Sequence, residues 1–239
     1  MRDTEQELGK QTVGELVARD YRTAQVFEKY GIDFCCGGKV ALSEACHEKG
    51  IDLKQVLHDL DQVAEQPVDR SQNYTAWELP FLADYIVNTH HAYLRENTGT
   101  IAGYAHKIAE VHGPHHPEVV QIAGIFDTMA ADLTQHLREE EDELFPTIRK
   151  MTELVKQGAA PDSEEVKTLR ALLVSLTHEH DKIGDAIHAI RRLARDYEIP
   201  DDVCNTFAVT YRKLKEFEDD LHKHVHLENN ILFLKAAKL

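Results

Sequence analysis

Apolar residues recur at alternating steps of three and four along four segments of this chain. The longest segment runs from about residue 118 to residue 151, and its stripe reads Ile122, Phe126, Met129, Leu133, His136, Glu140 and Leu144. This spacing places the whole set on one face of a long helix, which must be buried against other elements. Strand-like alternation and G-x-G loops are absent from the sequence, so sheets and nucleotide folds have no support.

The other three segments predict helices of similar length. A capping box at Thr75-Ala76-Trp77-Glu78 opens the first, which we expect to continue, with a break near residues 97–100, until His112 and the following Pro114 stop it. The third helix begins near Ser163 and the fourth near Pro200. Because short polar loops join the four, residues 76–239 predict an antiparallel up-and-down four-helix bundle.

A smaller helical domain precedes the bundle, over residues 1–66. It opens with a capping box at Thr12-x-x-Glu15, and four glycines mark tight turns around the adjacent cysteines Cys35 and Cys36. Residues 67–75 are polar and serve as a linker between the two domains. The whole chain is therefore predicted to be all-α.

Charge and composition limit the partners and the compartment. The formal net charge of −15 opposes binding to nucleic acid or to anionic membranes, and no apolar run has the length of a signal peptide or a membrane span. We therefore expect a cytoplasmic protein with reduced thiols. Adjacent cysteines have Cα atoms about 3.8 Å apart, which is too close for a relaxed disulfide. Cys46 and Cys204 are predicted to be small buried hydrophobes.

Ionisable residues stand on the four apolar stripes where a bundle would carry leucine. They are His90, His136, Glu140, His180, His224 and Glu228. A single histidine on such a face is more often a hydrogen-bonded core residue than a ligand. A buried carboxylate, however, must be paired, protonated or bound to metal. Glu139, Glu141 and Asp142 point away from the stripe and are predicted to be solvated charges.

The set of four imidazoles and two carboxylates suits two iron ions. Each ion would take two histidines, and both would share the carboxylates as bridges. Structural zinc would more usually bring cysteine ligands and four-coordination, and manganese is the less favoured alternative.

Two groups of motifs carry a resemblance to a known family. Residues 30–39, YGIDFCCGGK, contain the vicinal cysteines, and the bundle contains His136-x-x-x-Glu140, His178-Glu179-His180-Asp181 and His224-x-x-x-Glu228. With these motifs the chain resembles the RIC (repair of iron centres) family, the YtfE/ScdA group of di-iron proteins, over nearly its whole length. The resemblance implies a small ScdA-type domain followed by a hemerythrin-like bundle.

The resemblance also implies a ligand set. His90, His136, His180 and His224 would be terminal ligands of two non-haem irons joined by an oxo or hydroxo bridge, and Glu140 and Glu228 would be bridging carboxylates. His91 is the alternative to His90, which the stripe through Tyr85, Ile86 and Tyr93 favours. His112 would have an auxiliary role near the metal. The family pattern suggests proline where this chain has Leu234, beyond the ligands.

The implied function is repair of iron-sulfur clusters damaged by nitric oxide or oxidative stress, with the di-iron centre as the iron source and damaged iron-sulfur proteins as clients. An enzymatic alternative is binding and reduction of nitric oxide or dioxygen at the same centre. An oxygen carrier is disfavoured because Gly184 stands where such carriers offer a histidine. Ferritin-like oxidation or storage is disfavoured because the single Glu-x-x-His pair, Glu44 with His47, lies outside the bundle. Cys35 and Cys36 could transfer iron, take electrons or form a homodimer contact.

Overall fold

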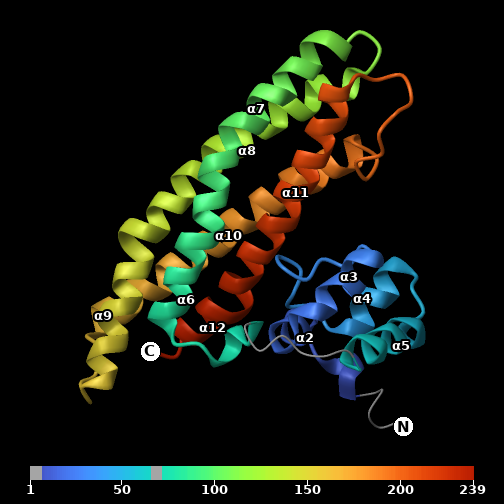
Figure 1. Cartoon of the computed structure of the whole chain (residues 1–239). Helices are drawn as coiled ribbons and strands as arrows, with labels where there is room; N and C mark the ends of the chain where they lie inside the picture. The colour runs from blue at the N-terminus through green and yellow to red at the C-terminus, as the bar shows by residue number, and fades with distance from the viewer. Residues whose placement is uncertain (1–6, 66–71) are drawn as a thin grey trace. The chain divides into compact units, whose positions relative to one another are not determined.

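The computed structural model describes residues 7–65 and 72–239 (Figure 1). Within these ranges the regular structure is helical, apart from one isolated bridge between Thr12 and Ala41, which confirms the all-α prediction. Most of the predicted linker, residues 67–71, lies outside the described ranges. Its last residues enter a short 3₁₀ turn, η3 (Tyr74–Ala76).

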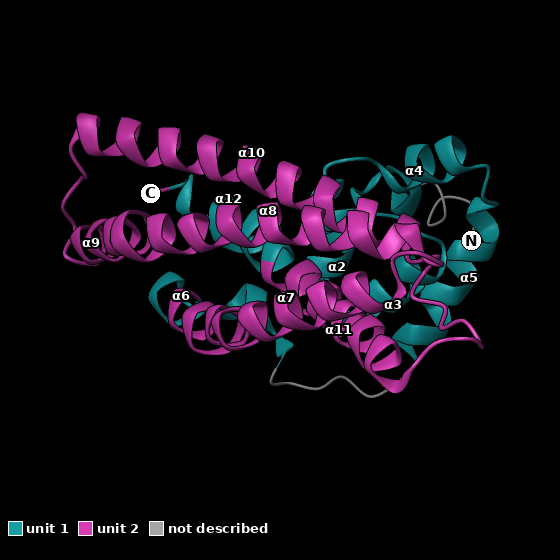
Figure 2. Ribbon diagram, turned by 90° about the horizontal axis from the view of Figure 1, so that it is seen from above, with its two compact units in different colours: residues 1–82, 225–238 teal, residues 83–224, 239 magenta. Residues whose placement is uncertain are grey.

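The chain forms two compact units (Figure 2). Unit 1 comprises Met1–Leu82 and Val225–Lys238, and unit 2 comprises Ala83–His224 with Leu239. The division passes through two continuous helices, α6 (Leu79–Ile86) and α11 (Asn205–Leu227). The last helical turns of the chain therefore group with the N-terminal region.

Unit 1 is built from short helices. In chain order they are α2 (Val13–Arg19), η1 (Tyr21–Thr23), α3 (Ala24–Lys29), α4 (Leu42–Lys49), α5 (Leu53–Ala64) and, near the C-terminus, η6 (Glu228–Leu232) and α12 (Phe233–Ala236). The predicted capping box is confirmed, because Thr12 accepts a hydrogen bond from the Glu15 backbone and the Glu15 side chain accepts one from the Thr12 backbone. Val13, Val17 and Phe27 are fully buried and form part of its core.

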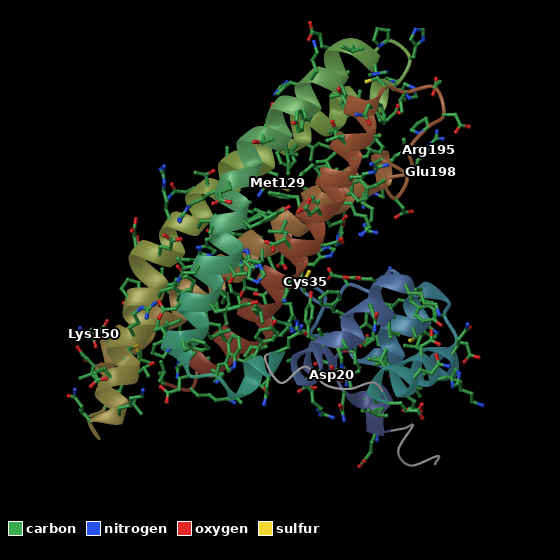
Figure 3. All side chains as sticks on the ribbon, viewed as in Figure 1. Asp20, Cys35, Met129, Lys150, Arg195 and Glu198 are labelled. Atoms are coloured by element: carbon green, nitrogen blue, oxygen red, sulfur yellow. The ribbon has the colours of Figure 1, made fainter. Side chains whose placement is uncertain are left out.

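Unit 2 is a bundle of long helices. They are α7 (Ala92–His112), α8 (Pro117–Glu139), α9 (Phe145–Lys156), α10 (Ser163–Leu193) and the part of α11 up to His224. Helix α8 packs against both α7 and α10, and α9 continues α8 in the same direction. Short loops make α8 antiparallel to α7, α10 antiparallel to α9, and α11 antiparallel to α10. Met129 points into the bundle (Figure 3) and is 2% exposed. Phe126 of α8 meets Phe217 of α11 with ring centroids 5.3 Å apart.

The predicted break near residues 97–100 is wrong, because α7 is continuous there. Asn97 and Thr98 each bond back to a carbonyl four residues earlier, those of Tyr93 and Leu94. These bonds satisfy the polar side chains within the helix, so they do not interrupt it.

The irregularities are instead three π-helical segments. They are η4 (Val87–His91), η5 (Glu140–Leu144) and η6 (Glu228–Leu232). Each one begins or ends at a buried histidine or glutamate: His91, Glu140 or Glu228. Pro146 follows η5 closely and cannot donate the backbone hydrogen bond of an α-helix. Leu234 follows η6 at the equivalent place, so a π segment forms there without proline and the helix continues as α12.

None of the helices in the described ranges combines the length and apolar character that crossing a membrane requires.

Candidate metal centre

Glu140 is a fully buried carboxylate at the point where α8 passes into η5. Its Oε1 lies 3.4 Å from Nε2 of His136 and 4.0 Å from Nε2 of His180. Its Oε2 lies 3.4 Å from Nε2 of His91 and 3.9 Å from Nε2 of His224. Neither oxygen accepts a hydrogen bond from the described residues. Each carboxylate oxygen therefore faces its own pair of imidazoles.

The two imidazole pairs are tight and buried. Nε2 of His136 and Nε2 of His180 are 2.9 Å apart, and Nε2 of His91 and Nε2 of His224 are 3.2 Å apart. All four side chains are at most 1% exposed. At these separations no more than one nitrogen of each pair can carry a hydrogen atom, so the other presents a lone pair. Lone pairs that converge in this way are what a metal ion requires.

Two further carboxylates hold these imidazoles from outside the cluster. Nδ1 of His91 lies 2.7 Å from Glu141 Oε1, and Nδ1 of His136 lies 2.9 Å from Glu179 Oε2. Because a carboxylate accepts, each Nδ1 donates, which leaves the Nε2 lone pair directed at Glu140. This carboxylate–histidine arrangement is typical of metal-ligating histidines.

The pKa values of these outer carboxylates reflect their partners. The hydrogen bond from His136 lowers the pKa of Glu179 against the opposing effect of burial. Burial by itself raises the pKa of Glu141, but hydrogen bonds from Arg95 and His91 outweigh it and leave the pKa below its ordinary value. Both carboxylates are therefore held in the charged form that an imidazole N–H favours.

Glu228 follows His224 by one turn, and an unbroken helical backbone from α11 into η6 joins the two. It is fully buried. Within unit 2 the ligand atoms of the described residues form two sets in which all atoms lie within 4.8 Å of one another: His91, Glu140 and His224, and His136, Glu140 and His180. Each set has two imidazoles, and Glu140 is common to both.

The structure brings His91, and not the predicted His90, into this cluster. A π turn takes up more residues than an α turn, so the 3.6-residue period used for the stripe slips across η4. Both histidines are buried, but Nδ1 of His90 bonds Asp220 at 3.0 Å, and its ring stacks on His224 at 6.0 Å between centroids. His90 therefore packs beside the cluster as a neighbour of His224.

Three other expectations need correction. Glu141 is not a solvated charge, since it binds His91 and Arg95 with its side chain 24% exposed. His112 is not near the cluster, because the 21-residue helix α7, about 30 Å long, separates it from His91. At the far end of α7, Nε2 of His112 lies 3.1 Å from the sulfur of Cys204. Cys204 is exposed, so the prediction that it is a buried hydrophobe is wrong. Cys46 is buried, as predicted. No spacing within its own helix reveals this role of Glu141, because its partners His91 and Arg95 lie about 50 residues earlier in the chain.

Cys35 and Cys36 lie within unit 1 and form no disulfide, with sulfurs 3.9 Å apart. Cys35 is buried, and its sulfur is 3.1 Å from Asp33 Oδ1. The hydrogen bond with Cys36 and then burial raise the pKa of the Cys35 thiol. The two thiols and the Asp33 carboxylate place their atoms within 4.8 Å of one another, a second group able to hold a metal ion.

The loop that carries Cys35 and Cys36 is hydrogen-bonded to η6, the segment that begins with Glu228. The amide of Asn230 donates to the carbonyl oxygens of Phe34 and Cys35, at 3.1 and 3.4 Å. Gly14 allows this approach, because a Cβ there would lie 2.2 Å from Asn230 Oδ1. The loop that carries the thiols is therefore bonded to Asn230, two residues after Glu228 in the chain.

Comparison with known families agrees with this architecture. Residues 82–236 match the family model of the hemerythrin HHE cation binding domain, and residues 9–64 match ScdA_N, a domain of unknown function. The iron-sulfur cluster repair protein ScdA of Staphylococcus haemolyticus is 30% identical over 225 residues, covering 94% of this chain and 97% of that protein.

Relatives from other bacteria align over a similar length. The iron-sulfur cluster repair protein YtfE of an Enterobacter species is 31% identical over 226 residues, covering 95% of this chain and 96% of its own. That of Pectobacterium carotovorum is 32% identical over 235 residues, with coverage of 95% and 97%.

The helical bundle, with imidazoles and carboxylates buried together inside it, defines a hemerythrin-like protein with a cation-binding site. Its N-terminal ScdA_N domain and its full-length relatives narrow the class further. The chain belongs to the ScdA/YtfE family, whose named members are iron-sulfur cluster repair proteins.

Proposed function

We propose that this chain binds two iron ions and delivers iron to damaged iron-sulfur clusters. His91 and His224 would hold one ion, His136 and His180 the other, and Glu140 would lie between them. The observation that carries the proposal is the position of Glu140, whose two oxygens face the two imidazole pairs separately. A lone ion would leave one oxygen of this buried carboxylate without a partner.

Glu228 would be the second shared carboxylate, since it is fully buried and follows His224 by one turn of the same unbroken helix. The chemistry of the donors supports iron, because imidazole and carboxylate suit it and no thiolate belongs to either set. The bound ions would supply exchangeable iron to the client. The names of the relatives support the clients proposed here, which are iron-sulfur proteins with damaged clusters.

Release of iron would depend on the residues that hold it. Protonation of the imidazoles or of Glu140 competes with metal binding, so ligand protonation favours release. Glu141 and Glu179 oppose this by fixing the tautomers of His91 and His136 with Nε2 unprotonated. They would therefore determine how readily each ion leaves.

We propose that Cys35 and Cys36 receive the iron on its way out. Thiolates bind iron well, and the Asp33 carboxylate adds a third ligand atom nearby. Asn230 bonds their loop to η6, so the thiols are tied to the segment that carries Glu228. Alkylation of both thiols should slow iron delivery while the iron content remains unchanged.

The test follows labelled iron. The chain is first loaded with ⁵⁷Fe. It is then mixed, in the presence of a reductant, with a [4Fe–4S] dehydratase whose cluster has been damaged by nitric oxide. We expect ⁵⁷Fe in the restored cluster as client activity returns, and we expect Glu140→Gln to abolish both. Glu143→Gln, an exposed carboxylate in the same π segment, is the matched control.

Two results would contradict the proposal. One is recovery of client activity while the chain keeps its labelled iron. The other is normal repair by Glu140→Gln. Formation of nitrous oxide by the reduced chain, with no label transferred, would favour reduction of nitric oxide at the centre in place of iron delivery.

A further inference from the structure

A second group of imidazoles and a carboxylate lies in unit 2, apart from the residues of the cluster. His188 is on α10, and Glu218 and His222 stand one helical turn apart on α11. Their ligand atoms lie within 4.8 Å of one another. His222 stands two residues before His224 on α11, about 200° around the helix, so the two face different sides and the proposed iron centre makes no use of His222.

Glu218 is the buried member of this group. It is 0% exposed, and its Oε1 accepts a hydrogen bond from Arg191 Nε at 2.8 Å. Its Oε2 accepts no hydrogen bond from the described residues. Arg191 balances the charge of Glu218, and the Tyr197 hydroxyl also faces this carboxylate, but Oε2 keeps lone pairs that a metal ion can bind.

Arg191 cannot readily serve both oxygens, because other groups hold its guanidinium. Its Nη1 lies 3.5 Å from Asp196 Oδ1, and its Cζ lies 5.7 Å from the centre of the Tyr197 ring. Both partners belong to the turn after α10 that Arg195 and Glu198 mark in Figure 3. Arg195, Asp196 and Tyr197 all have positive φ, at 49°, 55° and 62°, so the turn holds a fixed and unusual shape.

The imidazoles are placed to complete a site around Glu218. Nε2 of His222 lies 3.7 Å from Glu218 Oε1, and the His188 and His222 rings have centroids 5.8 Å apart. Two ligands at about 2.1 Å from a tetrahedral ion stand about 3.4 Å apart, close to the 3.7 Å between His222 and Glu218, and His188 offers its ligand atom within 4.8 Å of both. The His222 side chain is 12% exposed and His188 is half-buried, which leaves a route for an ion from solvent.

We propose that His188, Glu218 and His222 bind a single divalent transition-metal ion, separate from the proposed di-iron centre. Two imidazoles and one carboxylate suit zinc or ferrous iron and do not suit magnesium or calcium, which prefer oxygen ligands. The hydrogen bond from Arg191 Nε to Glu218 Oε1 orients the carboxylate, as residues that bond to metal ligands commonly do. The ion links α10 to α11. His188 lies eight residues after His180 and His222 lies two residues before His224, so the ion holds together two helices that carry histidines of the proposed iron centre.

The test uses cobalt(II) on the full-length chain already loaded with iron. After gel filtration, the cobalt and iron contents per chain are measured by mass spectrometry of the elements. We expect about one cobalt per wild-type chain and at least a tenfold loss of cobalt affinity in His188→Gln and in His222→Gln. Glu218→Gln keeps an acceptor for Arg191 and should lose cobalt as well. Iron content should be the same in all of these proteins.

His106→Gln is the matched control, since His106 pairs with Asp127 at 2.9 Å as an exposed histidine and carboxylate without a third ligand. It should bind cobalt like the wild type. The proposal is overturned if the wild type retains no cobalt, if both histidine variants retain it fully, or if His106→Gln loses it equally. Because iron content and cluster repair are measured independently of cobalt, failure here would leave the proposed iron delivery intact.

Discussion

Replacing Glu141 by glutamine should weaken one of the two proposed iron positions and leave the other almost unchanged. The variant keeps an oxygen that can accept from His91 Nδ1 but removes the negative charge from that 2.7 Å bond. Outer partners of metal ligands typically contribute about 10- to 100-fold to metal affinity. The Glu141 side chain is 24% exposed and is shared with Arg95, which places the effect near the lower end.

We therefore expect about a tenfold loss of affinity, equivalent to about 1.4 kcal/mol, at the position held by His91 and His224. Glu179→Gln should have the same effect at the position held by His136 and His180, because Glu179 bonds His136 at 2.9 Å with 29% exposure. Since the two variants affect different imidazole pairs, each variant should hold one iron weakly and the other tightly.

Competition with a ferrous chelator measures this directly. Each variant should release its iron in two separated steps, whereas Glu143→Gln, a nearby exposed carboxylate, should match the wild type. Loss of both irons at the same chelator concentration would show that the two positions do not depend on separate outer carboxylates. An unchanged release curve for both variants would refute the reasoning altogether.

Three further predictions concern the helices and the remaining thiols. Phe217→Ala should lower the free energy of unfolding by about 3–5 kcal/mol in denaturant titrations, because this fully buried ring leaves a cavity in the bundle. The hydrogen bond from His112 lowers the pKa of Cys204 to about 7, so alkylation of Cys204, followed by peptide mass spectrometry, should rise through about pH 7. In His112→Ala that midpoint should move upward, and an unchanged midpoint would contradict the pairing. Gly14→Ala should destabilise the chain, as a lower thermal midpoint, because its Cβ would lie 2.2 Å from Asn230 Oδ1; a midpoint equal to that of the wild type would show that Asn230 moves aside freely.

Local sequence signals predicted the helical architecture because they act within one or two turns. The capping box at Thr12 and Glu15 forms as expected, and α7 ends at His112 before Pro114. The apolar stripe through Phe126 and Met129 is buried along α8. Periodicity of this kind reports which face of a helix avoids water, so it also selected Glu140 and Glu228 as buried carboxylates.

Periodicity could not locate the π segments, since a single wide turn depends on the packing around it. This is why the stripe favoured His90 over His91: η4 is a wide turn that ends at His91, and it shifts which residue faces the cluster. The role of Glu141 as a hydrogen-bond partner of His91 could not be predicted for a related reason. Its partners, His91 and Arg95, come from a helix about 50 residues earlier in the chain.

The sequence by itself determined that this is an all-α chain with histidines and carboxylates on buried helix faces, because helix period and burial are local properties of the residues. Only the tertiary structure decided which imidazoles meet. His136 and His180 are separated by 44 residues, and His91 and His224 by 133, yet their nitrogens lie 2.9 and 3.2 Å apart. Pairing across such distances depends on the order and direction in which the helices pack, which spacing along one helix does not encode.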